Sequence, residues 1–318
     1  MRQQEWRGVF PAVTTPFNSD LSVNYPALRR HVSWLLDSGC KGVILLGSLS
    51  ESPTLTQGEK IEMLRQCKEQ IGNRAPLLAG VSGLATAEAV RLARSAEEVG
   101  CDGLMVLPHF VYQGDWRETE AHLSAVISAT PLPCMLYNNP ISYGTDVTPP
   151  QIVALSRHPN LCAVKESSGD IRRVAAIRES LGERLAIFAG LDDVVVESVA
   201  AGAVGWVAGL ANALPLESVR LFDLASSGNT LETWQLYNWF LPLLRLDAVP
   251  KFVQLIKLVQ SETGTGSPAV RPPRLELAGS EREEVLRMIR KRLAERPAVL
   301  AMRQQAGNGD AALPSPRV

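Results

Sequence analysis

The chain has 318 residues, of which 46% are hydrophobic and 20% charged, and its formal net charge is −1. This near-neutral balance, without a basic block, argues against nucleic acid or an anionic membrane as a partner. No segment approaches the ~18 consecutive apolar residues of a membrane-spanning helix. Residues 1–10 contain no apolar stretch long enough for a signal peptide, so we expect a cytoplasmic protein.

Short apolar runs alternate with amphipathic stretches along most of the chain. The runs are apolar throughout, as is typical of parallel strands covered by helices on both faces. Thr56 and Glu59 have the spacing of a capping box, which predicts a helix start at that point. The predicted strands are 8–14, 42–47, 76–81, 103–107, 134–137, 161–165, 186–189 and 204–208, and the predicted helices between them are 25–36, 56–71, 85–99, 114–129, 149–156 and 171–181.

Eight strand–helix units in about 225 residues favour a (β/α)8 TIM barrel over an open sheet. No G-x-G-x-x-G motif follows the first strand, which argues against a dinucleotide-binding fold. Beyond residue 224 the pattern predicts only helices, at 230–246, 249–262 and 280–294. We therefore expect a barrel with the active site over residues 1–228, a C-terminal helical extension over 229–295 and a disordered tail over 296–318.

Two polar residues end successive predicted strands. Lys165 closes the apolar run 161–164, and Tyr137 closes the run 133–136. Active sites of such barrels lie at the C-terminal ends of the strands, so the two side chains are expected to meet in one pocket. The alternative is a lysine that reaches solvent or pairs with the neighbouring Glu166.

A buried lysine has a specific chemical use. Desolvation lowers its pKa from ~10.4, and the neutral amine attacks a ketone or aldehyde to form an imine. The protonated imine accepts electrons when a neighbouring bond breaks, which serves aldol chemistry, dehydration and deamination. Each of these reactions needs a proton shuttle near the imine, and the hydroxyl of Tyr137 can act as one.

Four motifs occur in a characteristic order. Together they resemble the dihydrodipicolinate synthase/N-acetylneuraminate lyase family of class I aldolases, and the resemblance covers about residues 5–295. It implies a (β/α)8 barrel, usually a homotetramer, that forms a Schiff base with a 2-oxo acid such as pyruvate and needs no cofactor, and we expect this chain to be a homotetramer or a homodimer. The motifs are Val13-Thr14-Thr15-Pro16-Phe17, Gly47-Ser48-Leu49-Ser50-Glu51, Tyr137-Asn138-Asn139-Pro140 and Lys165-Glu166-Ser167-Ser168-Gly169-Asp170.

The resemblance assigns roles to individual residues. Lys165 is expected to form the imine and Tyr137 to shuttle protons. Ser48, with the backbone N–H of Leu49, is expected to hold the carboxylate of the 2-oxo acid, because a tight turn after a strand presents N–H donors to an anion. Two further positions, Gly190 and Val207, are expected to line the pocket beside the lysine.

The sequence departs from dihydrodipicolinate synthase itself in three places. The synthase has a second threonine where this chain has Leu49, and a tyrosine lent by a neighbouring subunit where this chain has Phe110. Tyr112 is a candidate substitute for that tyrosine, and His109 a candidate acid or base. The arginine that binds the carboxylate of aspartate semialdehyde corresponds to Ser142, and a neutral serine cannot replace a bidentate cation.

We therefore expect a Schiff-base lyase with a different reaction. The candidate reactions are those of a deaminase acting on a cyclic imine such as 1-pyrroline-4-hydroxy-2-carboxylate, and of a 2-oxo-3-deoxy sugar acid dehydratase or aldolase. One alternative is dihydrodipicolinate synthase proper, with pyruvate and aspartate semialdehyde as substrates. Another is a non-catalytic family member that binds a 2-oxo acid.

The remaining polar and sulfur-containing residues indicate no metal site. Five cysteines lie far apart without a C-x-x-C pair, which is typical of buried thiols in a reducing compartment. Asp192 and Asp193 precede a helical pattern and are interpreted as helix-capping residues rather than metal ligands.

Overall fold

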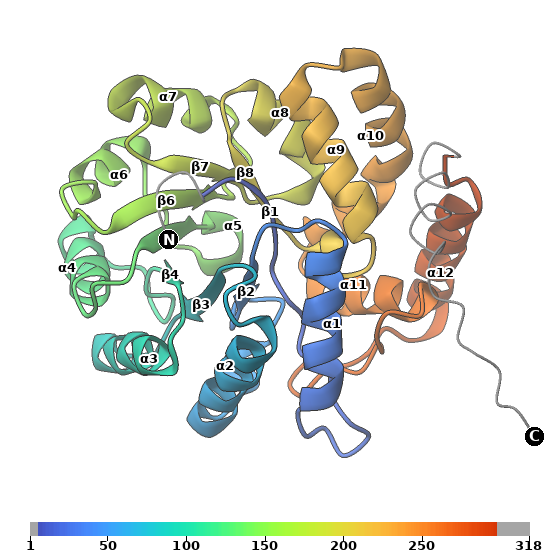
Figure 1. The fold of residues 1–318 in the computed structure, drawn as a ribbon, viewed down its shortest axis with the longest axis horizontal. Helices are drawn as coiled ribbons and strands as arrows, with labels where there is room; N and C mark the ends of the chain where they lie inside the picture. Colours follow the sequence, from blue (N-terminus) through green and yellow to red (C-terminus); the bar gives the residue numbers. More distant parts are fainter. Residues whose placement is uncertain (1–5, 298–318) are drawn as a thin grey trace, which may run out of the picture.

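The computed structural model describes residues 6–297, which form a barrel of eight parallel strands (Figure 1). The strand order is β1-β8-β7-β6-β5-β4-β3-β2, so the strands from β2 to β8 lie in the order of the sequence and β1 pairs with β8. A parallel bridge between Ala12 and Ile44, with a 2.9 Å hydrogen bond from the Val13 N–H to the Ile44 carbonyl, joins the two ends of the sheet. The predicted TIM barrel is thereby confirmed. The strands are β1 (Gly8–Pro11), β2 (Val43–Leu45), β3 (Leu77–Val81), β4 (Gly103–Val106), β5 (Cys134–Asn138), β6 (Leu161–Glu166), β7 (Ala186–Ala189) and β8 (Gly205–Ala208).

Helices surround the sheet and cover the outer faces of its strands (Figure 1). The Thr56 side chain accepts from the Glu59 N–H while the Glu59 carboxylate accepts from the Thr56 N–H, so the predicted capping box is present. The helices are α1 (Tyr25–Asp37), α2 (Gln57–Ile71), α3 (Thr86–Val99), α4 (Trp116–Ile127), α5 (Pro140–Tyr143), α6 (Pro149–Leu155), α7 (Arg172–Leu181), α8 (Val195–Ala200) and α9 (Pro215–Ser227). Single 3-10 turns lie in the loops as η2 (Ser52–Thr54), η3 (Asp192–Val194) and η4 (Leu210–Asn212).

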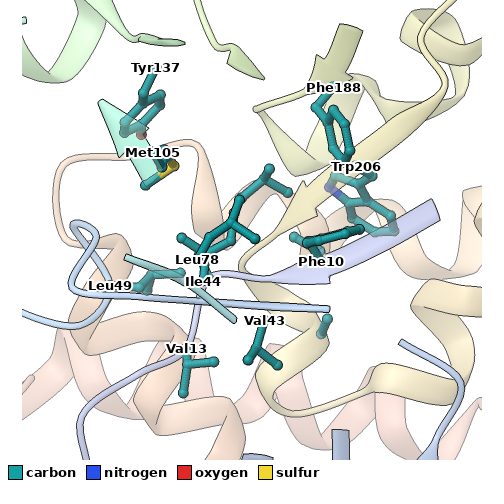
Figure 2. Packing of buried hydrophobic residues seen from close by; sticks show 14 of the residues in the cluster. Phe10, Val13, Val43, Ile44, Leu49, Leu78, Met105, Tyr137, Phe188 and Trp206 are labelled. Atoms are coloured by element: carbon teal, nitrogen blue, oxygen red, sulfur yellow. The ribbon is translucent and has the colours of Figure 1, made fainter. Parts of the chain in front are cut away.

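The interior of the barrel is filled by large apolar side chains from the strands. Phe10 and Phe188 meet edge to face, with ring centroids 5.5 Å apart. Figure 2 shows these two rings grouped with Trp206, while Ile44 and Leu78 lie beside them. Gly205 and Gly42 make room for the rings, since a Cβ at either position would lie within 2.4 Å of Phe188 or Phe10. The barrel is therefore a packed core, and its functional space must lie at one end.

Three further helices follow the barrel: α10 (Thr230–Leu244), α11 (Phe252–Glu262) and α12 (Gly279–Ala294), with η5 (Arg245–Asp247) between the first two. They match the predicted helices of the C-terminal region. Hydrogen bonds connect α11 to the loops of the barrel, from Lys257 Nζ to Glu51 Oε1 (2.6 Å) and from Thr14 Oγ1 to Gln260 Oε1 (2.9 Å). The division at residue 228 stays a prediction, and most of the predicted tail lies outside the described residues.

Between residues 6 and 297 no helix is both long and apolar enough to span a membrane.

Candidate functional site

A pocket opens at the C-terminal ends of the strands, where Lys165 and Tyr137 lie side by side. The two residues are direct partners in the β5–β6 ladder, so both side chains point to the same side of the sheet. The Lys165 Nζ lies 4.0 Å from the centroid of the Tyr137 ring, and only 6% and 4% of the two residues is exposed. The structure thus brings together the two residues that the strand ends pointed to.

Lys165 is not engaged by its neighbour in sequence. The carboxylate of Glu166 accepts hydrogen bonds from the Ser168 N–H (2.6 Å) and from Asn138 Nδ2 (3.2 Å). Within the described part of the chain no ion pair joins it to Lys165, so the alternative of a simple surface pair does not hold. Burial lowers the pKa of the Lys165 ammonium, and the nearby Asp247 opposes this shift. The neutral amine is the form that attacks a carbonyl.

The hydroxyl of Tyr137 belongs to a short chain of hydroxyl groups. Asn139 Nδ2 donates to the Tyr137 oxygen (2.9 Å), and the Ser48 hydroxyl lies close enough to it to lower its pKa. Ser48 Oγ in turn is hydrogen-bonded to the hydroxyl of Tyr143. Burial is the larger influence on Tyr137 and raises its pKa, so the phenol stays protonated. The three hydroxyls of Tyr137, Ser48 and Tyr143 therefore form a path for protons.

The local sequence explains the position of Tyr143. Asn139 caps the single turn α5, Pro140 occupies its first position and Gly144 ends it with φ 75°. This turn folds the chain back, so that the ring of Tyr143 lies edge to face with that of Tyr137, at 5.9 Å between centroids. Tyr143 was not predicted as a site residue, because its contact with Ser48 depends on this turn. The only signal in the sequence was its position six residues after Tyr137.

The loop after β2 carries Ser48 and Leu49. Leu46 and Glu51 both adopt left-handed backbone conformations, with φ 62° and 55°, which are costly for residues other than glycine. The loop is fixed from two sides, by the hydrogen bonds from Ser50 Oγ to the Val13 carbonyl (2.5 Å) and from Thr15 Oγ1 to the Ser50 carbonyl (2.6 Å). Such a strained and well-anchored loop holds its polar groups in fixed positions.

The pocket contains most of the residues expected from sequence. Ser48, Leu49, Ser142, Gly190, Val207 and Phe110 line it together with Lys165 and Tyr137. Gly190 is needed there, since a Cβ would lie 2.9 Å from Lys165 Cγ and 1.9 Å from Ser167 Oγ. The cavity has a volume of about 350 Å³, which suits a small molecule.

His109 and Tyr112 are placed differently. His109 is buried away from the lining of this pocket, 3.1 Å from Thr119 Oγ1, and Tyr112 is exposed and stacks on it with centroids 5.0 Å apart. Neither therefore replaces the missing tyrosine within its own chain. Their contribution to a neighbouring subunit stays a prediction.

Three ionisable groups in or behind the pocket were not predicted as site residues. Asp247 of η5 and Arg274 line the pocket, although they lie 82 and 109 residues beyond Lys165 in the chain. Asp192 is buried behind the pocket, and its carboxylate accepts from Trp206 Nε1 (2.8 Å) and from the Leu210 N–H (2.7 Å). The prediction that Asp192 and Asp193 cap the helix that follows them is wrong, because α8 has no side-chain cap and Asp192 holds the start of η4 after β8 instead.

The residues between 6 and 297 contain no group of three His, Cys, Asp or Glu side chains arranged to hold a metal ion. The polar groups that line the pocket suit acid–base and imine chemistry.

Comparison with known proteins gives a consistent family. The model of the dihydrodipicolinate synthetase family matches residues 5–292. A 4-hydroxy-tetrahydrodipicolinate synthase of Desulforamulus reducens is 31% identical over 278 residues, which cover 87% of this chain and 94% of the relative. One from Clostridium perfringens is 33% identical over 238 residues, covering 75% of this chain and 81% of the relative.

Solved structures agree. The synthase of Methylacidiphilum fumariolicum SolV superposes with a TM-score of 0.88 at 28% identity, covering 93% of this chain and 98% of that one. A dihydrodipicolinate synthase from Aquifex aeolicus gives 0.85 at 26% identity, covering 90% and 97%. Proteins of this family act on small molecules and are generally oligomeric. The chain belongs to the dihydrodipicolinate synthetase family and is a lyase of the class I aldolase type.

Proposed function

We propose that Lys165 forms an imine with its substrate, either from a small 2-oxo acid or by transimination of a cyclic imine. The enzyme then eliminates a group from the bound substrate. The observation that carries this proposal is the buried contact between Lys165 Nζ and the Tyr137 ring at 4.0 Å. A buried amine with a lowered pKa is a nucleophile, and a neighbouring phenol supplies and accepts the protons of carbinolamine formation.

The other roles follow from the lining of the pocket. Ser48 and the backbone N–H of Leu49 hold the substrate carboxylate, and Gly190 and Val207 leave space for its carbon chain. Tyr137, Ser48 and Tyr143 pass protons between the imine and the pocket. The relay thus has three hydroxyls from one chain, although Leu49 and Phe110 provide none.

The reaction that we favour is dehydration or deamination. The substrates are a 2-oxo-3-deoxy sugar acid or 1-pyrroline-4-hydroxy-2-carboxylate, each with a single carboxylate. Ser142, an exposed and neutral residue, lines the pocket where an arginine would bind a second carboxylate. A substrate with one carboxylate leaves no charge that needs a partner there.

The second candidate is the condensation of pyruvate with aspartate semialdehyde. The names of the relatives favour it, since those that are 31% and 33% identical are 4-hydroxy-tetrahydrodipicolinate synthases. One structural observation also favours it: Arg274 lines the pocket and makes no ion pair with any residue between 6 and 297. An arginine from the C-terminal segment offers a charge for a second carboxylate that Ser142 cannot bind.

Borohydride trapping tests the proposal. The panel consists of pyruvate, 2-oxo-3-deoxypentonate and 1-pyrroline-4-hydroxy-2-carboxylate, followed by peptide mass mapping. A reduced adduct on Lys165 is expected, and Lys165→Ala is expected to lose it together with turnover. No adduct from any of the three would refute imine catalysis and favour a non-catalytic binding protein.

Turnover then separates the two reactions. Release of water or ammonia from the hydroxylated substrates supports the lyase. Efficient condensation of pyruvate with aspartate semialdehyde, without turnover of the other two, establishes the synthase. Arg274→Ser is a matched test, because it is expected to weaken binding of aspartate semialdehyde only if the second candidate is correct.

We also propose an oligomer, a homotetramer or a homodimer, in the cytoplasm. Exposed apolar side chains after β3, β4 and β5 support the oligomer: Leu84, Val111, Tyr112 and Ile141 are each more than half exposed. Five free cysteines are consistent with a reducing compartment. Analytical ultracentrifugation measures the oligomeric state directly.

A further inference from the structure

The pocket contains a second ionisable group beside the lysine. Asp247, the last residue of η5, lines the same pocket as Lys165 although it comes from the helical region after the barrel. Its Oδ1 is buried and has no hydrogen-bond partner among the described residues. An unpaired carboxylate in such a place is costly, so this group requires a functional explanation.

Gly209, which follows β8, fixes the position of this carboxyl group. A Cβ on Gly209 would lie 2.1 Å from Oδ1 and 2.4 Å from Cγ of Asp247, so the carboxyl packs directly against the glycine. The backbone φ of Gly209 is −81°, which any residue can adopt. Glycine at this position is therefore explained by the close approach of Asp247 and not by backbone conformation.

The surroundings of Asp247 favour its neutral form. Burial raises its pKa well above the usual value, the charge of Asp192 adds to this, and Lys165 opposes it. The titratable and charged groups in or next to the pocket come from β5, α5, β6, η3 and the segment after α11: Tyr137, Tyr143, Lys165, Asp192, Asp193 and Arg274. A protonated carboxyl group is a hydrogen-bond donor and an acid.

We propose that Asp247 is the acid that protonates the oxygen leaving carbon 4 of a hydroxylated 2-oxo acid bound as an imine on Lys165. This inference rests on the proposed function, and it gives the C-terminal region a part in the chemistry. Tyr137 and Asp247 come from β5 and η5, so the pocket has separate groups for the proton at carbon 3 and for the leaving oxygen.

The elimination begins at the iminium on carbon 2, which loses a proton from carbon 3 to the Tyr137 relay and becomes an enamine. The enamine electron pair then forms a double bond between carbons 3 and 4, and the bond between carbon 4 and oxygen breaks. The oxygen takes the proton of Asp247 and leaves as water. The proton from carbon 3 returns to the Asp247 carboxylate, so the net change is the loss of one water.

Asp247→Asn tests this role, because the amide keeps the size of the side chain and cannot transfer the proton. We expect the kcat for loss of water from 2-oxo-3-deoxypentonate and 1-pyrroline-4-hydroxy-2-carboxylate to fall on the order of 10²–10⁴-fold. Borohydride trapping of pyruvate and exchange of its C3 protons with deuterium need no leaving group, so both should change only a few-fold.

Two more variants sharpen the test. Gly209→Ala is expected to displace the carboxyl and reproduce the loss of elimination in a milder form. Asp193→Asn removes a nearby carboxyl that does not line the pocket but adds to the raised pKa of Asp247, so it should keep elimination and only move its alkaline decrease to a lower pH. In the wild type, kcat for elimination should fall as the pH rises through the pKa of Asp247, and Asp247→Asn should lack this alkaline decrease.

The outcomes distinguish the two proposals. Absence of any adduct in the wild type, or an adduct without loss of water from either probe, refutes the proposed function and with it the role of Asp247. An Asp247→Asn enzyme that eliminates at the normal rate overturns the role of Asp247 alone and leaves the proposed function intact.

Discussion

The buried ion pair between Lys257 of α11 and Glu51 provides a sharp test of how the C-terminal helices support the pocket. Lys257 Nζ lies 2.6 Å from Glu51 Oε1, with 2% and 0% of the two side chains exposed. Lys257 also donates to the Ala269 carbonyl (2.6 Å), and Glu51 accepts from the Arg271 N–H (3.0 Å). Both charges of the pair are therefore satisfied inside the protein.

Lys257→Met removes the cation and leaves the Glu51 carboxylate buried with a single backbone donor. Breaking a buried pair in this way costs about 3–5 kcal/mol of the free energy of unfolding. For a chain of this size the corresponding fall in Tm is roughly 4–8 °C. Since Glu51 ends the loop that carries Ser48, we also expect a higher KM for the 2-oxo acid.

Denaturant unfolding followed by circular dichroism measures the loss. Lys251→Met is the matched control, because its pair with Glu281 is half exposed (52% and 50%) and should contribute at most about 1 kcal/mol. The double variant Glu51→Gln/Lys257→Met removes the unpaired charge and should regain part of the stability. Equal losses in the free energy of unfolding for Lys257→Met and Lys251→Met would refute the reasoning.

Three other predictions concern the relay, the pocket wall and acid stability. Tyr143→Phe should slow C3 proton exchange of bound pyruvate on the order of 10²-fold, because Ser48 loses its hydrogen-bond partner in the relay. An equally slow exchange in Tyr112→Phe would instead place the third hydroxyl of the relay in a neighbouring subunit. Gly190→Ala should reduce borohydride trapping at Lys165 and lower the free energy of unfolding by about 1–3 kcal/mol, since the new Cβ would lie 1.9 Å from Ser167 Oγ. Trapping at the wild-type level would contradict this prediction. The bidentate hydrogen bond from Arg271 lowers the pKa of Glu59 to about 2, below its unfolded value of ~4.3. The stability that the Glu59 carboxylate contributes is therefore complete above pH ~4.3 and is lost as the pH falls toward 2. In Glu59→Gln the free energy of unfolding should depend less on pH in this range, and an unchanged slope would contradict the prediction.

The barrel could be predicted because its signal is local. Strands buried on both faces must be apolar throughout, so each appears in the sequence as an uninterrupted run, and the helices between them carry their own caps. The errors of the prediction lie at the ends of the strands. The first predicted strand extends to residue 14, whereas β1 ends at Pro11, because Thr14 and Thr15 turn away to bind Asn212, Gln260 and the Ser50 carbonyl.

The relay shows where a local pattern is insufficient. The absence of a hydroxyl at Leu49 and Phe110 is visible in the sequence, and it suggested an incomplete relay. In the fold, the one-turn helix α5 returns Tyr143 to Ser48 and supplies a hydroxyl from the same chain. A side chain that reaches its partner through a turn leaves no periodic signal.

The placement of Lys165 and Tyr137 at the ends of β6 and β5 could be predicted without coordinates, because strand ends are local features and a barrel aligns them. The presence of Asp247 and Arg274 in the same pocket could not be predicted in this way. Their positions depend on how the C-terminal helices pack on the barrel loops, through pairs such as Lys257 with Glu51 that are 206 residues apart. Contacts between such distant segments arise from packing and charge in three dimensions, which the order of residues does not display.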